Sequence, residues 1–462
     1  MPGFIEGLLD QRAGEKFELH EKALNSQMVR MLKTIGFNRD YRRGVGPYLF
    51  DGKGDRYLDL MSGWGVFALG RNHPFVNAAL KEVLDRDLTH LIQMDVTLLS
   101  GLLAEALLES APGEGLERVF FSNSGTEAVE GALKMAKYAT GRDRTVHLEH
   151  SFHGLTMGSL SLTDEAAFRD GFGSMLANCQ AVPLNDLEAL DRALSTRDVA
   201  AFIVEPIQGK GVNIPQDGYL AEAKRLCEKY ETIFIADEIQ TGLGRTGAMW
   251  AVEHWGVEPD MILAAKALSG GQAPVGAIMS KRWIHDAVFN RMDRAVVHGS
   301  TFGKNNLGMA AGLATLQVLK EENLVAQAKA MGERLLADLG PMVEKYEFVK
   351  DVRGKGLMLA VEFGRPESLR LRASWALLEA ADHALFSQMV LMPLLSEHRV
   401  LAQVAGHGLH VIKLLPPLVI GAEDCDWIVS ALDQSIADCH RVPGSVWKLG
   451  KSLARQATAA SA

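Results

Sequence analysis

Residues 118–139 read RVFFSNSGTEAVEGALKMAKYA, and this stretch indicates the fold class of the chain. The apolar run at 118–122 predicts a short buried strand, and a helical pattern follows directly after the turn Ser-Asn-Ser-Gly-Thr. Further strands are predicted before and after a helix at 218–230; they lie at 144–149, 199–206, 232–238, 260–265 and 275–280. Apolar strands that alternate with helices are typical of a mainly parallel sheet covered on both faces, so the sequence predicts an α/β fold.

The segments that flank this region have a different pattern. Residues 1–35 are predicted to be helical, and the Asp-Gly and Lys-Gly pairs at 51–54 indicate a hairpin turn between short strands. After Phe348, strands and helices follow in the mixed order of an α+β unit. We therefore expect an N-terminal segment of a smaller domain (1–60), a large domain (61–340), the remainder of the smaller domain (341–445) and a flexible tail (446–462).

Composition argues against several classes of protein. The net charge is -9, whereas a nucleic-acid-binding protein needs a basic face to neutralise phosphates. No run of 18 apolar residues is present and the first residues do not resemble a signal peptide, so we expect no membrane span and a cytoplasmic location. The cysteines lie outside metal-binding spacings and are expected to be buried free thiols; they are Cys179, Cys227, Cys425 and Cys439.

The turn between the first strand and its helix is a candidate phosphate site. It places Ser124, Gly125 and Thr126 at a helix N-terminus, where free N–H groups and the helix dipole favour an anion. Gly125 allows a close approach of the backbone to a ligand. An ordinary Ser/Thr helix cap, with Glu127 in the first turn, is the structural alternative.

A second candidate group lies in the stretch IFIADEIQTGLGRTG at 233–247. Asp237 ends an apolar strand, and a buried carboxylate there needs a partner. A protonated pyridine nitrogen would be such a partner, with Ile239 and Gln240 within reach of the same ring. A structural ion pair or a helix cap is the alternative.

The same stretch contains GLGRTG at 242–247, which fits the glycine pattern of dinucleotide-binding proteins. In those proteins the motif joins an early strand directly to a long helix. Here it follows acidic residues, and AMWAVEHWG after it is a poor start for a helix. A nicotinamide-dependent oxidoreductase is therefore kept only as an alternative.

The third candidate is Lys266 in MILAAKALSGG, at the end of an apolar strand and before a glycine-rich turn. Burial among apolar side chains lowers the pKa of an amine and favours its nucleophilic free base. A lysine, a carboxylate for a ring nitrogen and a phosphate-binding turn are what pyridoxal phosphate requires of a protein. The sequence therefore predicts this cofactor.

These residues stand in motifs that resemble the class III aminotransferases of fold type I, the ornithine, putrescine and ω-amino acid type. The matching stretches cover most of the chain from about Gly46 to Cys439; they are FFSNSGTEAVEGALKMA, HSFHG, IVEPIQGKGV, IADEIQTGLGRTG, AAKALSGG, HGSTFG and LLPPL. The resemblance implies a large domain with a mainly parallel seven-stranded sheet, a smaller α+β domain, and a homodimer with active sites at the subunit interface.

The resemblance also implies a role for each matched position. It assigns the cofactor to Ser124, Gly125, Thr126, Phe152, His153, Glu205, Asp237, Ile239, Gln240, Lys266 and Thr301, and the substrate to Trp64, Glu205 and Lys413. Lys266 would form the Schiff base and move the proton, and Asp237 would pair with the ring nitrogen. Phe152 would stack on the ring beside His153, Glu205 would be the gating glutamate, and Thr301 would reach the phosphate of the neighbouring subunit.

Two departures from the family pattern bear on the substrate and the subunit contact. Lys413 stands where the family usually has an arginine that binds a substrate carboxylate, and lysine lacks the bidentate fork. Residues 303–306 read Gly-Lys-Asn-Asn where Gly-Gly-Asn-Pro is common, next to the expected subunit contact.

The expected activity is amino transfer between a terminal amine and a carbonyl acceptor. The donor would be a diamine, an ω-amino acid or an apolar amine, and the acceptor a 2-oxo acid such as 2-oxoglutarate or pyruvate; the lysine at 413 also leaves room for a substrate without a carboxylate. An aminomutase, a racemase or a decarboxylase on the same scaffold is the alternative. A non-catalytic relative would have lost Lys266, which is present.

Overall fold

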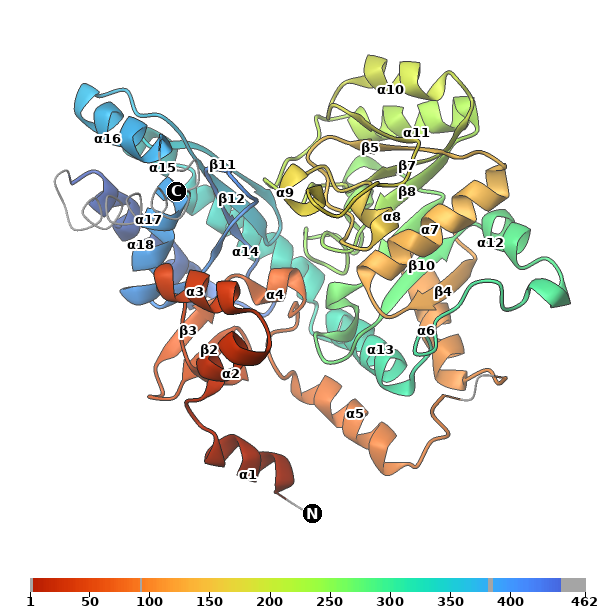
Figure 1. Ribbon diagram of the computed structural model, residues 1–462, viewed down its shortest axis with the longest axis horizontal. Coiled ribbons are helices and arrows are strands. Elements are labelled where there is room, and N and C mark those ends of the chain that lie inside the picture. The colour runs from red at the N-terminus through yellow and green to blue at the C-terminus, as the bar shows by residue number, and fades with distance from the viewer. Residues whose placement is uncertain (1–2, 92–93, 381–384, 442–462) are drawn as a thin grey trace.

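The computed structural model describes residues 3–91, 94–380 and 385–441, and the chain forms two lobes (Figure 1). The larger lobe contains a seven-stranded sheet in the order β4-β10-β9-β8-β7-β5-β6. Its strands are β4 (Arg118–Ser122), β5 (Arg144–Leu148), β6 (Cys179–Val182), β7 (Val199–Val204), β8 (Ile233–Asp237), β9 (Met261–Ala264) and β10 (Gly276–Ser280). Only β10 runs antiparallel to its neighbours, so the predicted mainly parallel α/β sheet is confirmed.

Helices cover both faces of this sheet because successive residues of each strand point to opposite sides. Ile233 and Ile235 of β8 pack with α7 (Gly125–Thr140), whereas Phe234 and Ala236 pack in the other cluster with α11 (Tyr219–Tyr230). The other helices of this lobe are α5 (Pro74–Asp85), α6 (Leu98–Glu109), α8 (Met157–Leu160), α9 (Ala166–Arg169), α10 (Leu187–Leu194), α12 (Arg282–Val288) and α13 (Asn306–Glu321).

The smaller lobe holds two four-stranded sheets built from both ends of the chain. One joins β1 (Tyr41–Val45), β2 (Tyr48–Asp51), β3 (Arg56–Asp59) and β13 (Val400–Leu401), and β3 pairs with β13 in parallel. The other joins β11 (Val349–Lys355), β12 (Met358–Phe363), β15 (Val411–Leu414) and β14 (Gln403–Val404). Its helices are α14 (Leu324–Leu339), α15 (Met342–Lys345), α16 (Leu369–Glu379), α17 (Leu385–Ser396) and α18 (Ala422–Cys439). The predicted domain boundaries within this arrangement stay predictions.

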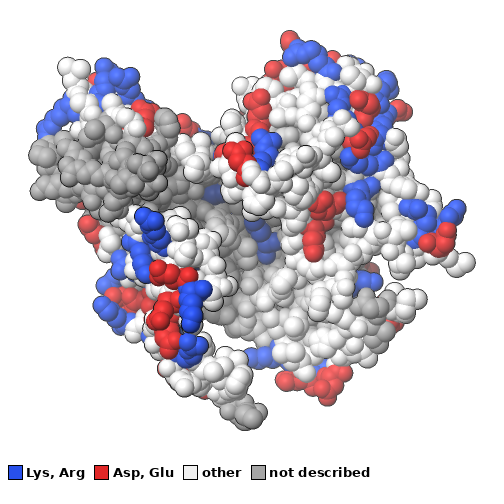
Figure 2. All heavy atoms as spheres, in the orientation of Figure 1, with Lys and Arg blue, Asp and Glu red and all other residues white. Residues whose placement is uncertain are grey.

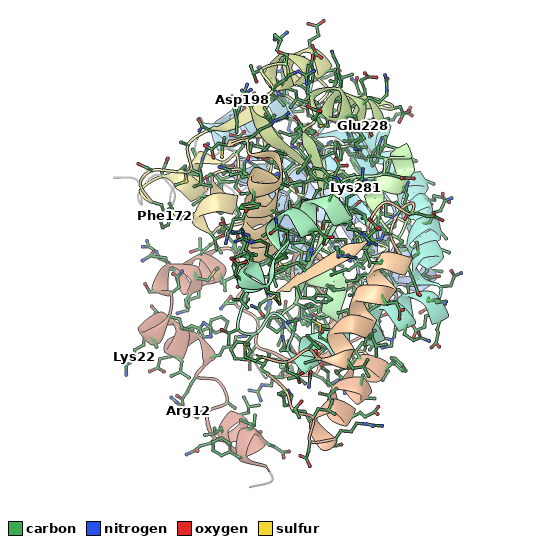
Figure 3. All side chains as sticks on the ribbon, turned by 90° about the vertical axis from the view of Figure 1, so that its right-hand side faces the viewer. Arg12, Lys22, Phe172, Asp198, Glu228 and Lys281 are labelled. Carbon is green, nitrogen blue, oxygen red and sulfur yellow. The ribbon has the colours of Figure 1, made fainter. Side chains whose placement is uncertain are left out.

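The N-terminal helical region consists of α1 (Phe4–Gln11), α2 (Lys16–Ala23) and α3 (Ser26–Thr34). These helices lie at the edge of the smaller lobe, and Arg12 and Lys22 project away from the body of the molecule (Figure 3). The predicted flexible tail at 446–462 lies outside the described residues. Within the described part, no helix combines the length and the hydropathy that a membrane crossing requires.

The GLGRTG segment forms turns between β8 and the 3-10 helix at Ala251–Trp255, and no long helix begins at it. Arg245 of this segment is buried and donates hydrogen bonds to the carbonyl oxygens of Leu357 (3.0 Å) and Pro416 in the smaller lobe. Burial lowers the pKa of Arg245 to about 9. The motif therefore joins the two lobes, and the dinucleotide interpretation of its glycines is wrong.

Candidate active site

Five of the predicted site residues lie at one edge of the large sheet. Lys266 follows β9, Asp237 ends β8, Glu205 follows β7, and Phe152 and His153 follow β5 by a few residues. These four strands are consecutive neighbours and parallel, so their carboxyl ends meet at the same edge. Sheet order therefore places the lysine, the two carboxylates and the histidine in a row.

The predicted phosphate turn lies at the same edge, because antiparallel β10 pairs Gly276 with Ser122 at the end of β4. Ser124 is the N-cap of the 16-residue helix α7, and its hydroxyl accepts a hydrogen bond from the N–H of Glu127 (3.3 Å). A Cβ added to Gly125 would lie 2.9 Å from the side chain of Ile239, so a larger residue there would force Ile239 to shift. Ile239 thus reaches the first residue of α7 and connects the phosphate turn with the end of β8.

Asp237 and His153 form a buried pair. Oδ2 of Asp237 lies 2.7 Å from Nδ1 of His153, and Oδ1 accepts a hydrogen bond from the N–H of Ile239 (3.1 Å). Both side chains are almost fully buried, and Nε2 of His153 has no hydrogen-bond partner among the described residues. These contacts fix the plane of the carboxylate and keep lone pairs available for another donor.

Lys266 lies at the end of β9 in the left-handed region, with φ of 42°. For a residue other than glycine this conformation costs on the order of 1–3 kcal/mol, which is typical of functional positions. Burial lowers the pKa of the Lys266 amine, although the negative charges of Asp237 and Glu205 oppose this effect. The lower pKa increases the fraction of the nucleophilic free amine at neutral pH.

Glu205 is buried and binds the backbone on both sides. Its Oε1 accepts a hydrogen bond from the N–H of Phe152 (2.9 Å), and its Oε2 accepts one from Gly209 (2.8 Å). Burial raises the pKa of Glu205, and Asp237 adds to this rise, whereas His153 opposes it. Glu205 therefore holds the Phe152 segment against the end of β7.

Lys413 and Trp64 come to the site from the smaller lobe. Lys413 of β15 is buried, and its Nζ donates to the carbonyl oxygen of Gly209 (2.6 Å) and to Oε1 of Gln240 (3.2 Å). Nε2 of Gln240 donates in turn to the carbonyl oxygen of Trp64 (3.0 Å), whose side chain is 59 % exposed. Burial, with the nearby charge of Lys266 as second cause, lowers the pKa of Lys413 to about 7. Gln240 thus links Lys413 to the Trp64 turn.

Thr301 is exposed in the 298–304 segment. Its neighbour Ser300 accepts a hydrogen bond from Nδ2 of Asn123 (2.6 Å), so the segment lies beside the phosphate turn of the same chain. Within the described part of the chain, no hydrogen bond joins the hydroxyl of Thr301 to another predicted site residue, and its place in a dimer stays a prediction.

Sequence reasoning missed several neighbours of these residues. Lys210, directly after Gly209, forms a half-buried ion pair with Glu165. Asp59 accepts hydrogen bonds from the N–H of Ser62 (2.9 Å) and the guanidinium of Arg71 (2.7 Å), which supports the turn that carries Trp64. The position of Lys210 inside the quoted IVEPIQGKGV motif was a usable signal, whereas the pairing of Asp59 depends on tertiary structure.

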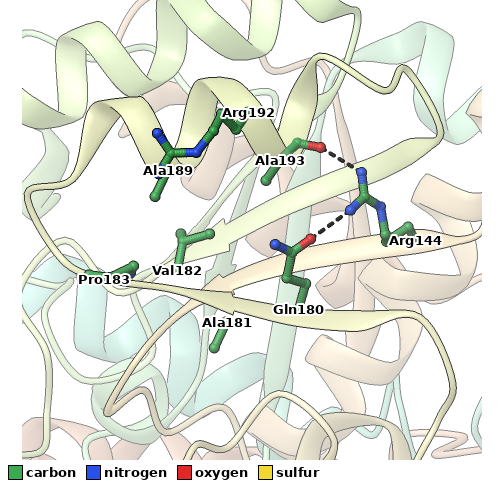
Figure 4. A pocket seen from close by; sticks show the side chains of 8 residues that line it. All are labelled: Arg144, Gln180, Ala181, Val182, Pro183, Ala189, Arg192 and Ala193. Carbon is green, nitrogen blue, oxygen red and sulfur yellow. Dashed lines mark hydrogen bonds between the residues drawn. The ribbon is translucent and has the colours of Figure 1, made fainter.

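The surface of the molecule is hollowed between the two lobes, and its charged side chains gather mainly on the outer faces (Figure 2). A separate hollow lies at the β6 edge of the sheet, between that strand and α10 (Figure 4). Arg144 at this second hollow is bound to Gln180 (2.6 Å) and to the carbonyl oxygen of Ala193 (2.5 Å). The second hollow has no group of the candidate site in its lining.

The residues at the carboxyl edge fit pyridoxal phosphate. The N-terminus of α7 suits the phosphate, the glycine at position 125 leaves room beside Ile239, and Asp237 has lone pairs for a ring nitrogen. Lys266 supplies an amine with a lowered pKa. Fold and site together define a pyridoxal-phosphate-dependent enzyme of fold type I.

The family model for class III aminotransferases matches residues 33–436, and the chain belongs to this family. It is 34% identical to Aminotransferase PigE from Serratia sp. (strain ATCC 39006), over 93% of this chain and 54% of that protein, so it spans about half the length of this relative. Ornithine aminotransferase from Toxoplasma gondii has a TM-score of 0.79 at 29% identity and covers 94% of this chain and 97% of its own.

A pyridoxal-phosphate-bound amine transaminase from an uncultivated Pseudomonas species has a TM-score of 0.75 at 30% identity. The alignment covers 87% of this chain and 95% of that one. Pyridoxal 5'-phosphate is therefore the cofactor, and the predicted family, fold type and enzyme class are confirmed.

Proposed function

We propose that the chain transfers an amino group between a terminal amine and a 2-oxo acid, with its cofactor attached covalently to Lys266. This proposal is carried by the row of Lys266, Asp237, Glu205 and His153 at the carboxyl ends of consecutive parallel strands. An ornithine aminotransferase and an amine transaminase among the similar structures support a terminal amine as donor.

When bound, pyridoxal phosphate supplies an aldehyde for the amine and a ring that withdraws electrons. Asp237 holds a proton on the ring nitrogen, and His153 keeps its carboxylate in place. A donor amine would displace Lys266 from the cofactor, and the amine of Lys266 freed in this way would take the proton from the substrate carbon and return it on the cofactor side. With the cofactor bound, the donor would give up its nitrogen and take an oxygen atom from water to leave as a carbonyl compound, and the acceptor would undergo the reverse exchange.

The remaining residues bind and orient. Ser124, Gly125 and Thr126 would bind the phosphate, and Ile239 and Phe152 would pack against the ring, with Gln240 near its hydroxyl. Phe152 is held for this by Glu205 (2.9 Å) and by edge-on packing with Phe168 at 5.8 Å between ring centres. Trp64, Glu205 and Lys413 contact the substrate; Trp64 does so at the entrance, where its exposed side chain is accessible.

A homodimer in the cytoplasm completes the proposal. Large apolar side chains are exposed near Thr301 and on the α6 side of the larger lobe, which supports a subunit contact there; they are Met94, Val96, Leu98, Met292, Val296 and Phe302. Thr301 would reach the phosphate of the neighbouring subunit. The cysteines are free thiols, as a reducing compartment requires.

Incubation of the purified protein with a diamine and 2-oxoglutarate tests the activity. We expect glutamate to accumulate in step with an aldehyde from the diamine. Isomerised, racemised or decarboxylated amine without glutamate would instead establish another pyridoxal phosphate reaction on this scaffold.

We expect the binding of 2-oxo acids to depend on pH through Lys413. The protonated amine attracts a carboxylate and the neutral amine does not, so a pKa of about 7 means that this attraction is present below pH 7 and lost as the pH rises. Apparent KM values for 2-oxoglutarate should therefore be roughly tenfold higher at pH 8 than at pH 6, since one pH unit above a pKa removes about nine tenths of the charged form.

Lys413→Arg is the matched control, because arginine stays charged throughout this range. The variant should show a flat KM for 2-oxoglutarate, and the KM of a carboxylate-free amine should have the same pH profile in both proteins. If the arginine variant keeps the pH dependence of the wild type, Lys413 does not contact the acceptor carboxylate.

A further inference from the structure

Glu130 lies one helical turn after Thr126 on α7 and holds another segment in place. Its Oε1 accepts hydrogen bonds from the N–H groups of Gly158 (2.8 Å) and Ser159 (3.0 Å) and from the hydroxyl of Thr156 (2.6 Å). Thr156 is the N-cap residue of α8, and the other two are its second and third residues. Because three donors converge on one oxygen, the start of α8 is fixed against α7.

The two segments approach so closely that two glycines have no room for a side chain. A Cβ added to Gly158 would lie 2.1 Å from Oε2 of Glu130, and one added to Gly154 would lie 2.5 Å from Oγ1 of Thr126. Gly154 also has φ of 132°, which disfavours other residues. Gly154 directly follows Phe152 and His153, so the same contact positions the segment proposed to pack on the ring.

Three hydroxyl groups meet at this contact. Oγ1 of Thr126 lies 2.6 Å from Oγ of Ser159 and 2.8 Å from Oγ1 of Thr156, and it accepts a hydrogen bond from the N–H of Thr156 (3.2 Å). A carboxylate only accepts hydrogen bonds, so the hydroxyl hydrogen of Thr156 is committed to Glu130.

The oxygen of the Thr126 hydroxyl therefore faces hydrogen-bond donors from the start of α8. This oxygen accepts a hydrogen bond from the N–H of Thr156, and the hydroxyl of Ser159 is close enough to donate a second one. The other acceptors within reach of Ser159 are Oγ1 and the carbonyl oxygen of Thr156, and both are more distant at 3.1 Å. The hydrogen of the Thr126 hydroxyl can go to Oγ of Ser159, to Oγ1 of Thr156 or to an anion at the helix N-terminus. A charged phosphate oxygen is the strongest of these acceptors.

We propose that Glu130 is a positioning residue for the cofactor phosphate: by fixing Thr156 and the start of α8, it directs the hydroxyl hydrogen of Thr126 toward the phosphate. This inference rests on the proposed place of the phosphate at residues 124–126. A negative charge close to a phosphate would by itself weaken phosphate binding. The favourable effect proposed for Glu130 therefore depends on a side chain long enough to bring its oxygen to Thr156 and the start of α8, and not on the charge.

Three substitutions separate the length of the Glu130 side chain from its charge, and each is measured by the dissociation constants of the apoprotein for pyridoxal phosphate and for pyridoxal. Glu130→Asp keeps the charge but is one methylene too short, and we expect it to weaken pyridoxal phosphate binding about tenfold. We expect the same loss for Glu130→Ala, because about tenfold is typical when a hydrogen bond to a charged group is lost. Glu130→Gln keeps an accepting oxygen at full length and should stay within about threefold of wild type. Pyridoxal, which has no phosphate, should bind all four proteins with similar affinity.

Thr126→Val, made in the wild type and in Glu130→Asp, tests whether Glu130 acts through the Thr126 hydroxyl. The valine should weaken pyridoxal phosphate binding about tenfold in the wild type and have little further effect in the aspartate variant. Additive losses, an equal loss for pyridoxal, or binding by Glu130→Gln that is tighter than wild type by clearly more than about threefold would overturn the role of Glu130. If Thr126→Val alone has no effect, the proposed place of the phosphate fails instead.

Discussion

Lys266→Arg is expected to lower the rate of amino transfer by at least about 10³-fold, because arginine cannot provide a free amine at neutral pH. Burial lowers the pKa of the Lys266 amine, and this is the property that an arginine removes while it keeps the positive charge. The turnover number with a diamine and 2-oxoglutarate measures the loss. Borohydride reduction followed by peptide mapping should place the cofactor on the peptide of Lys266 in the wild type and on no peptide in the variant.

Lys281→Arg is the matched control for this substitution. Lys281 forms an ion pair with Asp260 at 2.7 Å at the start of α12, away from the row of site residues, and arginine can keep that ion pair. Its activity should equal that of the wild type. Attachment of the cofactor to a lysine other than Lys266, or an active Lys266→Arg enzyme, would refute the proposed role.

Asp237→Asn should reduce the turnover number by roughly 10²–10³-fold, a typical loss when one electrostatic partner of the reacting centre is removed. The amide has nearly the same shape, and its single oxygen can still accept the hydrogen bond from the N–H of Ile239, while its NH2 group faces His153 and can only donate. It no longer carries the charge that keeps a proton on the ring nitrogen, so the ring withdraws electrons less strongly. The absorbance spectrum of the bound cofactor and the steady-state rate measure the two consequences.

Glu238→Gln is a stringent control because Glu238 is the next residue and is equally buried. Its carboxyl group contacts Thr241 and the N–H of Val252 (2.9 Å) and not the row of site residues. Burial raises the pKa of Glu238 to about 7, so a neutral amide resembles a form that is already populated at neutral pH. A loss of rate in this variant equal to that of Asp237→Asn would show that any neutral substitution at this strand end disturbs the site.

Much of the fold, and the row of site residues at the carboxyl ends of the strands, could be predicted from the sequence, because both depend on local patterns. Apolar runs identified the central strands, and the carboxyl ends of parallel strands necessarily meet, which brings Lys266 and Asp237 together. The edge strand β6 was not predicted, since its residues are mostly only half-buried and form no continuous apolar run. Residues 1–35 were expected to be helical, and the described part of this region forms three short helices.

The contacts between the lobes could not be predicted in the same way. The partners of Lys413 are Gly209 and Gln240, which are far away in the sequence and come close only when the smaller lobe packs on the larger one. The contact of Glu130 with the start of α8 likewise joins two segments separated by a whole strand. Its sequence signal was weak: Thr126 and Glu130 are four residues apart and so lie on the same face of a helix.

The pairing of β3 with β13 also has a consequence for the order in which the protein can be completed during synthesis. Residues 58–59 of β3 find their neighbours at 400–401. At a translation rate of roughly 5–20 residues per second, the N-terminal hairpin waits on the order of tens of seconds for this partner to leave the ribosome. During that interval one edge of β3 has free N–H and C=O groups, and such an edge is a site for pairing with other nascent chains. A chain released from denaturant has no such delay, so refolding in vitro and folding during translation start from different exposed surfaces.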